Sequence, residues 1–197
     1  MGVLVHFDHN ANWGETRVCD ELITRDLARA GIAWGRWDAA TAIASDLSLH
    51  VLLAAPDGDL ASLRERFGAH RIERIRLAPG DIGWKALRRH LRDEAVVAAA
   101  EVRCFVEGAG LFHIRTAHGF FGLLCEAGEW VALPAGTRYG FDAGDVPELD
   151  ALRLFVEAPR PAARSTARNG LPLPLPPMDD FVDEVLRLTG HLAQTDS

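Results

Sequence analysis

The chain has 197 residues, of which 48% are hydrophobic and 25% charged, a composition typical of a globular protein with one sizeable core. Its formal net charge of −7 disfavours a nucleic acid or an anionic membrane as partner, because no basic cluster offsets the acidic residues. Three widely spaced cysteines argue against a disulfide framework, and no apolar stretch is long enough for a signal peptide or a membrane span. We therefore expect a cytoplasmic protein whose partner is a small molecule or another protein.

The first forty residues predict a strand, a helix and a second strand. Residues 2–7 alternate as a short strand and end at a polar turn over residues 8–12. Residues 17–30 carry apolar side chains at three- and four-residue spacing, the pattern of an amphipathic helix. Residues 33–38 read as a strand whose two tryptophans pack in the core.

The next fifty residues predict further helices and one strand. Residues 46–56 are apolar, and their periodicity does not decide between a strand and a buried helix. A short helix is expected over residues 60–67, a half-exposed strand over residues 72–77, and another helix over residues 81–93. Asp81 is the expected N-terminal cap of that last helix.

The central stretch, residues 101–141, is punctuated by glycines and predicts successive antiparallel strands joined by turns. Between the glycines lie short runs rich in valine, phenylalanine and leucine. Glu101 with Gly108 resembles the second half of the first cupin motif. The spacing G-x5-P-x-G-x2-Y from Gly128 to Tyr139 is similar to the second cupin motif, with tyrosine where a metal-binding histidine is usual.

Four segments narrow the resemblance to the acireductone dioxygenases of the methionine salvage pathway. They are RCFVEGAGLF at 103–112, LCE at 124–126, LPAGT at 133–137 and LRLF at 152–155. The resemblance implies a mainly β fold with flanking helices, a cupin double-stranded β-helix or jelly-roll barrel, over residues 1–160. Because many cupins pair, it also implies a homodimer.

The metal-binding pattern of the resembled family is largely replaced. That family holds Fe(II) or Ni(II) with an H-x-H-x3-E run and a distant histidine, and these positions fall on Ala95, Val97, Glu101 and Tyr139. One carboxylate beside a phenol does not satisfy a divalent ion, so we expect no metal cofactor. The alternative is an Fe or Ni site with relocated ligands, drawn from His90, His113, His118, Cys104 and Cys125.

The strand that begins at Glu101 alternates, so Glu101, Arg103 and Phe105 share one face. By resemblance, this face lines the barrel cavity and Arg103 takes the place of the family's substrate-contacting arginine. Tyr139 and Phe141 share a face for the same reason. Four residues are the expected apolar substrate contacts: Ala95, Val97, Phe105 and Phe141.

This set of side chains predicts metal-independent proton transfer on an organic anion or carbonyl compound, as in isomerisation, elimination or cyclisation. Glu101 would be the acid/base, since an apolar pocket favours its neutral form. Arg103 would bind a carboxylate or enolate, and Tyr139 would donate a hydrogen bond to it. Two alternatives remain open besides the relocated metal site. One is that Glu101 and Arg103 form a buried ion pair, and the other is that the cupin binds a small molecule without turnover.

The C-terminal third changes composition sharply. An acidic loop over residues 142–150 leads to a closing strand over residues 151–157. Residues 158–177 are rich in proline, which predicts an extended arm. A final helix is expected over residues 178–192. We expect residues 161–197 to pack as arm and helix on the barrel or on a partner subunit.

Overall fold

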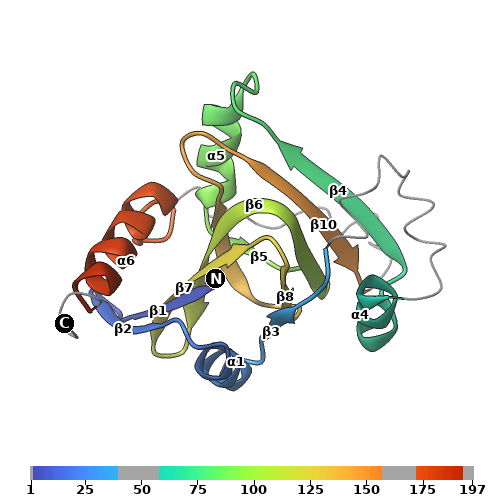
Figure 1. The fold of residues 1–197 in the computed structure, drawn as a ribbon, viewed down its shortest axis with the longest axis horizontal. Helices are drawn as coiled ribbons and strands as arrows, with labels where there is room; N and C mark the ends of the chain where they lie inside the picture. Colours follow the sequence, from blue (N-terminus) through green and yellow to red (C-terminus); the bar gives the residue numbers. More distant parts are fainter. Residues whose placement is uncertain (1, 40–57, 157–171, 193–197) are drawn as a thin grey trace.

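The computed structural model describes residues 2–39, 58–156 and 172–192. The undecided segment 46–56 lies outside these ranges, as does most of the proline-rich segment 158–177. Within the described residues the protein is mainly β, a curled cupin half-barrel with a few helices around it (Figure 1). The fold class expected from the sequence is confirmed.

Within the described ranges the sheet has ten strands and is organised around the long strand β6. The central path runs β2-β1-β7-β6-β10-β4, and β8 and β9 also pair with β6 while β3 pairs with β8 and β5 with β9. The strands are β1 (Val3–Phe7), β2 (Trp13–Arg17), β3 (Ala33–Arg36), β4 (Arg71–Leu77), β5 (Ala95–Val96), β6 (Glu101–Thr116), β7 (Gly119–Glu126), β8 (Glu129–Leu133), β9 (Arg138–Asp142) and β10 (Leu149–Phe155).

Strand β6 bends at Gly108 and thereby curls the sheet into a barrel. Residues before the bend pair with β8 and β10, and residues after it pair with β7 and β9. Gly108 has a φ of 71°, and an added Cβ would lie 1.7 Å from the Glu148 carbonyl oxygen. The turn expected at the glycines of this region is therefore wrong here, because the chain bends within one continuous strand (Figure 1).

Four helices are described around the barrel: α1 (Asp20–Arg29), α4 (Asp59–Phe67), α5 (Trp84–Arg92) and α6 (Met178–Leu192). The first starts later than predicted, because residues 13–17 pair with β1 as an edge strand. The third starts at Trp84, because the Asp81 carboxylate accepts a hydrogen bond from the Ala78 N–H at 2.9 Å and does not cap the helix. No helix among the described residues has the length and apolar character needed to cross a membrane.

The alternation predicted for β6 is confirmed by two separate cores. Phe105 points into the barrel with Phe112 and Phe141. Val102 and Cys104 point to the other face, into a cluster that includes Leu63 of α4 and Leu152 of β10. The two faces of one strand therefore serve two apolar layers, and the inner layer surrounds the predicted site.

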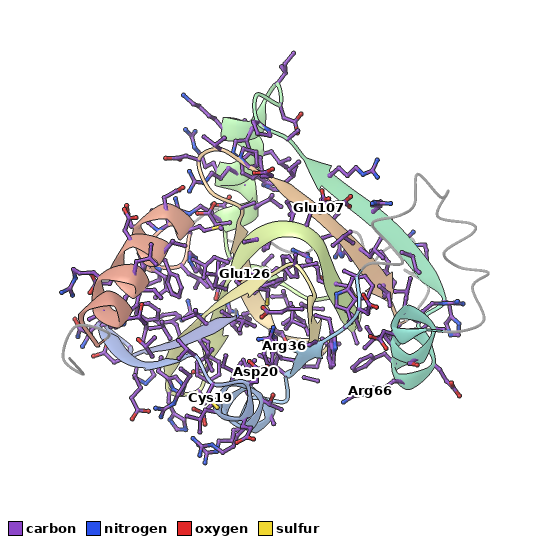
Figure 2. The ribbon with its side chains drawn as sticks, viewed as in Figure 1. Cys19, Asp20, Arg36, Arg66, Glu107 and Glu126 are labelled. Carbon is purple, nitrogen blue, oxygen red and sulfur yellow. The ribbon has the colours of Figure 1, made fainter. Side chains whose placement is uncertain are left out.

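Side-chain contacts fix the helices to the sheet. Phe181 of α6 packs 5.2 Å from the Trp13 ring, centroid to centroid, and 6.5 Å from the Phe7 ring. Figure 2 shows Asp20 at the start of α1 beside Arg36 of β3, where the Arg36 Nη2 donates to Asp20 at 2.9 Å. The helices thus cover the outside of the barrel and leave its inner layer to the strands.

Candidate functional site

The Glu101 carboxylate lies inside the barrel between two guanidinium groups. Glu101 opens β6, and 3% of its surface is exposed. Arg153 of β10 donates to one carboxylate oxygen from Nε at 2.8 Å and also from Nη2. Arg103 donates to the other oxygen from Nη2 at 3.3 Å. The negative charge is therefore compensated on both sides, as a buried carboxylate requires.

Arg103 has an N–H donor that is not used within the described residues. Its guanidinium carbon lies 4.6 Å from the Phe141 ring centroid and 5.1 Å from that of Phe112, so the cation faces two aromatic rings. The residue is 6% exposed, and its Nε meets no hydrogen-bond partner in the described part of the chain. An N–H donor held in this position favours a ligand that carries an acceptor.

Arg153 is the member of the site that sequence reasoning missed. Burial alone would lower the pKa of its guanidinium, but the charge and hydrogen bonds of Glu101 raise it above its ordinary value. The sequence predicts a strand over the LRLF segment but does not identify the strands with which it pairs. In the fold, Arg153 sits opposite Arg103 across the β6–β10 ladder, on the same face.

Tyr139 and the predicted apolar contacts lie together in the inner layer. Ala95 is directly opposite Tyr139 in the β5–β9 pair, and both belong to one buried cluster with Val97, Phe105 and Phe141. Strand β5 has only two residues, so Val97 follows directly after the strand.

Aromatic rings fill much of this inner layer. The Phe112 centroid lies 5.0 Å from Phe141, 6.0 Å from Tyr139 and 6.1 Å from Phe105. Three cavities on the described residues, of about 490 to 840 Å³, are lined by other residues. The site is therefore a polar cluster that lies against packed aromatic rings.

The residues suggested as relocated metal ligands do not converge. His90 is exposed on α5 and His118 is exposed in the turn after β6, whereas His113 is buried on the outer face of the sheet. Cys104 and Cys125 are fully buried, and burial raises the pKa of both thiols, which disfavours the thiolate that binds metals. Among the described residues, no group of three or more His, Cys, Asp and Glu is placed to hold a metal ion.

Comparison with known proteins places these features in a family. The model described as the ARD/ARD' family matches residues 71–163. An acireductone dioxygenase from Synechococcus elongatus is 34% identical over 143 residues, which cover 73% of this chain and 72% of that protein. Acireductone dioxygenases from Parvibaculum lavamentivorans (32% identical, 68% of this chain and 72% of that protein) and Methylococcus capsulatus (33%, 70% and 74%) are similar.

A solved structure shares the fold. The acireductone dioxygenase from Bacillus anthracis with a cadmium ion in its active center covers 80% of this chain and 94% of its own, with a TM-score of 0.65 and 22% identity. The dioxygenase relatives and this metal-containing neighbour point to a metal cofactor. The expectation that the chain has no metal cofactor is therefore wrong. That expectation rests on the replaced histidines alone and leaves out the enzymes that the chain resembles.

The side chains themselves do not fit the ligand set of the resembled family. Ala95 and Val97 offer no donor atom, and Glu101 already accepts hydrogen bonds from Arg103 and Arg153. Glu101 is thus the one carboxylate retained from the H-x-H-x3-E pattern. With the matched model, the identities above 30% and the shared cupin fold taken together, this chain belongs to the acireductone dioxygenase family.

Proposed function

We propose that this chain is an enzyme of the acireductone dioxygenase type that acts on a small organic anion or carbonyl compound at Glu101. One observation carries the proposal. Glu101 stands at the ligand position of the family, buried, and next to an arginine whose Nε has no hydrogen-bond partner in the described residues. A buried cation with an unused donor is suited to an anionic substrate such as an enediolate.

The proposed substrate competes with the Glu101 carboxylate for the two arginines. An anion that enters beside Arg103 and Arg153 takes over hydrogen bonds now made to Glu101, and this releases the Glu101 carboxylate to accept a proton. Tyr139 lies in the same buried cluster and serves as a hydrogen-bond donor to the developing oxyanion. Phe105 and Phe141, with Ala95 and Val97, exclude water from the reacting atoms.

The experiment measures turnover together with metal content. The full chain is purified, its Fe, Ni, Mn and Zn are quantified by mass spectrometry, and consumption of acireductone and oxygen is followed before and after chelation. We expect turnover that falls on chelation and returns with added Fe(II) or Ni(II). Absence of turnover in every metal state contradicts the proposal. Glu101→Gln should lower kcat at least about 100-fold, the usual effect of losing an acid/base.

A second experiment restores the ligands of the family. Because Ala95 pairs with Tyr139 in the inner layer, the triple variant Ala95→His, Val97→His and Tyr139→His would recreate the pattern around Glu101. We expect the triple variant to bind about one Ni(II) per chain and the single Tyr139→His to bind much less, since several ligands must act at once. Equal nickel content in the two variants would contradict the assignment of these positions.

The arrangement of Glu101 favours one other candidate function, a binding cupin without turnover. Both carboxylate oxygens are already engaged by arginines, and rings pack the surrounding layer. Such a protein would bind an organic anion with the same affinity after Glu101→Gln, and mass spectrometry would detect no product. Loss of kcat with unchanged substrate affinity in that variant separates the enzyme from the binding protein.

A further inference from the structure

A cavity of about 840 Å³ lies at one end of the sheet, away from the barrel interior. It is formed where the turns that follow β1 and β6 lie beside α1. Its volume is in the range of pockets that bind small molecules. None of the residues that line it belongs to the Glu101 cluster, so its ligand is separate from the proposed substrate.

Aromatic side chains make the apolar wall of this cavity. Phe7 and Phe120 are opposite each other in the β1–β7 pair, and Trp13 packs edge-on against Phe7 with ring centroids 5.2 Å apart. Phe121 lies one position along β7, with its ring 4.8 Å from that of His6. Rings that are partly open to a cavity favour a flat aromatic ligand.

The carboxylates of the cavity are already engaged by other groups of the protein. Asp8 accepts hydrogen bonds from the backbone N–H groups of Asn10 and Asn12 and from the Asn12 amide. Glu15 pairs with Arg17. These contacts occupy oxygens of both carboxylates, and Arg17 neutralises the charge of Glu15.

Asp26 of α1 lines the cavity and is bound by three guanidiniums. Its side chain is 2% exposed and is paired with Arg17 at 3.2 Å, with Arg25 at 3.0 Å and with Arg29 at 3.2 Å. Burial alone would raise the pKa of Asp26, but the hydrogen bonds from Arg25 and Arg17 lower it below its ordinary value. One carboxylate therefore binds several guanidiniums, and Arg29 is the one of these three that lines the cavity.

Two of these arginines share a partner on the same helix but differ in their access to the cavity. Arg25 and Arg29 both lie on α1 and both bind the Oδ1 atom of Asp26. Arg29 lines the cavity and its side chain is 71% exposed, whereas Arg25 does not line it. Arg29 engages Asp26 through Nη1, so its remaining N–H groups can bind an anion.

His6 adds a polar atom to the wall. Its Nε2 is buried, lies 3.3 Å from the Asp26 Oδ2, and is not aligned for a hydrogen bond with any described residue. Gly14 of β2 approaches His6 closely, since an added Cβ would lie 2.8 Å from the His6 carbonyl oxygen. The irregular register of β1 and β2 between Val5 and Phe7 thus shapes the cavity at His6.

We propose that this cavity is a second ligand site, which binds a small planar aromatic anion such as an aromatic carboxylate. The ring of the ligand packs against Phe121, whose ring lies beside His6 on the same face of the sheet. Its negative group is bound by Arg29, with His6 next to it. The proposal is independent of the reaction at Glu101 and goes beyond the function proposed above.

The test uses the full chain and two fluorescent probes that differ in charge. The anionic probe is 1-anilinonaphthalene-8-sulfonate, and the neutral one is N-phenyl-1-naphthylamine. We expect saturable binding of the anionic probe, about tenfold weaker in Arg29→Gln, because one charge-assisted contact is lost. Arg25→Gln is the matched control and should leave the affinity within about twofold of the parent chain. Binding of the neutral probe should be the same in all three proteins.

Each other result overturns the proposal. Equal weakening by Arg29→Gln and Arg25→Gln would show a general effect of charge on α1, and equal affinity for both probes would show an apolar patch. Circular dichroism and thermal unfolding verify that both variants are folded. Phe121→Leu, which keeps an apolar side chain and removes the ring, should weaken both probes, and an unchanged affinity there would exclude this cavity as the site.

Discussion

Two buried carboxylates, Glu101 and Asp142, are each held by arginines, yet their partners come from different parts of the fold. Glu101 binds Arg103 and Arg153, which lie on β6 and β10, strands already joined by a full ladder of hydrogen bonds. Asp142 ends β9 and binds Arg88 of α5 at 2.6 Å and the backbone N–H of Met178, the first residue of α6, at 3.0 Å.

This difference indicates which carboxylate can change its ion pairs without disturbing the fold. The ion pairs of Glu101 join elements that the sheet already holds together, so their rearrangement leaves the fold intact. Those of Asp142 join α5 and α6 to the sheet, and Arg88 extends the link to Asp179 at 2.7 Å. Burial of Asp142 alone would raise its pKa, but Arg88 and the Met178 N–H lower it below its ordinary value.

The largest effect on stability is therefore expected at Asp142. Asp142→Ala leaves Arg88 without its buried partner, and this should lower the free energy of unfolding by about 3–5 kcal/mol. Urea unfolding measures the loss, and limited proteolysis should show earlier cleavage of α6. Asp180→Ala, an exposed change on the same helix, should cost less than about 1 kcal/mol. Similar losses in the two variants would contradict the role of Asp142 as a link between elements.

The buried His113 lies in the same outer region and should make the stability of the protein depend on pH. It lies between Gly122 and Gly140 on neighbouring strands, where the Phe181 side chain of α6 lies over Gly122 and the Arg92 backbone lies over Gly140. Burial lowers its pKa from 6.5 to about 4, with Arg92 adding to the effect and Asp142 and the Pro176 carbonyl opposing it. Neither ring nitrogen has a hydrogen bond of normal geometry within the described residues.

The sign of the pH effect follows from the lowered pKa. Between pH 6.5 and 4 the unfolded chain binds more protons than the folded chain, so stability falls as the pH falls. From pH 7.5 to pH 5 the loss should be about 2 kcal/mol, and His113→Leu should remove most of it. The range stops at pH 5 because the stability contributed by ionised Asp142 is lost only at lower pH. The exposed His70→Gln is the control, and an unchanged pH dependence in His113→Leu would contradict the account.

The sequence was informative where a pattern is local. The apolar spacing of the last helix and the alternation after Glu101 gave both elements correctly, since side-chain direction in a strand follows from the period of two. Strand β2 was missed because WGETR has no apolar alternation and is an edge strand that pairs with β1 alone.

Only those residues of the candidate site could be predicted that follow from the family resemblance or from the alternation along a strand. Glu101, Arg103 and Tyr139 could be placed inside the barrel, but Arg153 lies 52 residues from Glu101, and their contact depends on the β6–β10 register. The packed rings around them also escaped prediction, because the volume left between strands depends on how far β6 bends at Gly108. The family pattern therefore indicates Glu101 as the candidate site, whereas the strand register brings Arg153 to it.

The smallest expected effect on stability, and the one most specific to the site, comes from the Glu101–Arg153 pair. In a double-mutant cycle, Glu101→Gln and Arg153→Gln should each destabilise, and their coupling energy should be about 1–2 kcal/mol, because neighbouring strands hold the backbone in place when the pair is lost. The matched control is Arg74→Gln, which breaks the ion pair of Arg74 with Asp150 across β4 and β10.

That control separates stability from function. Arg74→Gln should destabilise to a similar degree and leave kcat unchanged, whereas Arg153→Gln should raise the KM for an anionic substrate, since the guanidinium is proposed to bind it. If Arg153→Gln and Arg74→Gln change unfolding alike and neither alters KM, the Glu101 pair is structural. The two buried carboxylates would then differ in position and not in role.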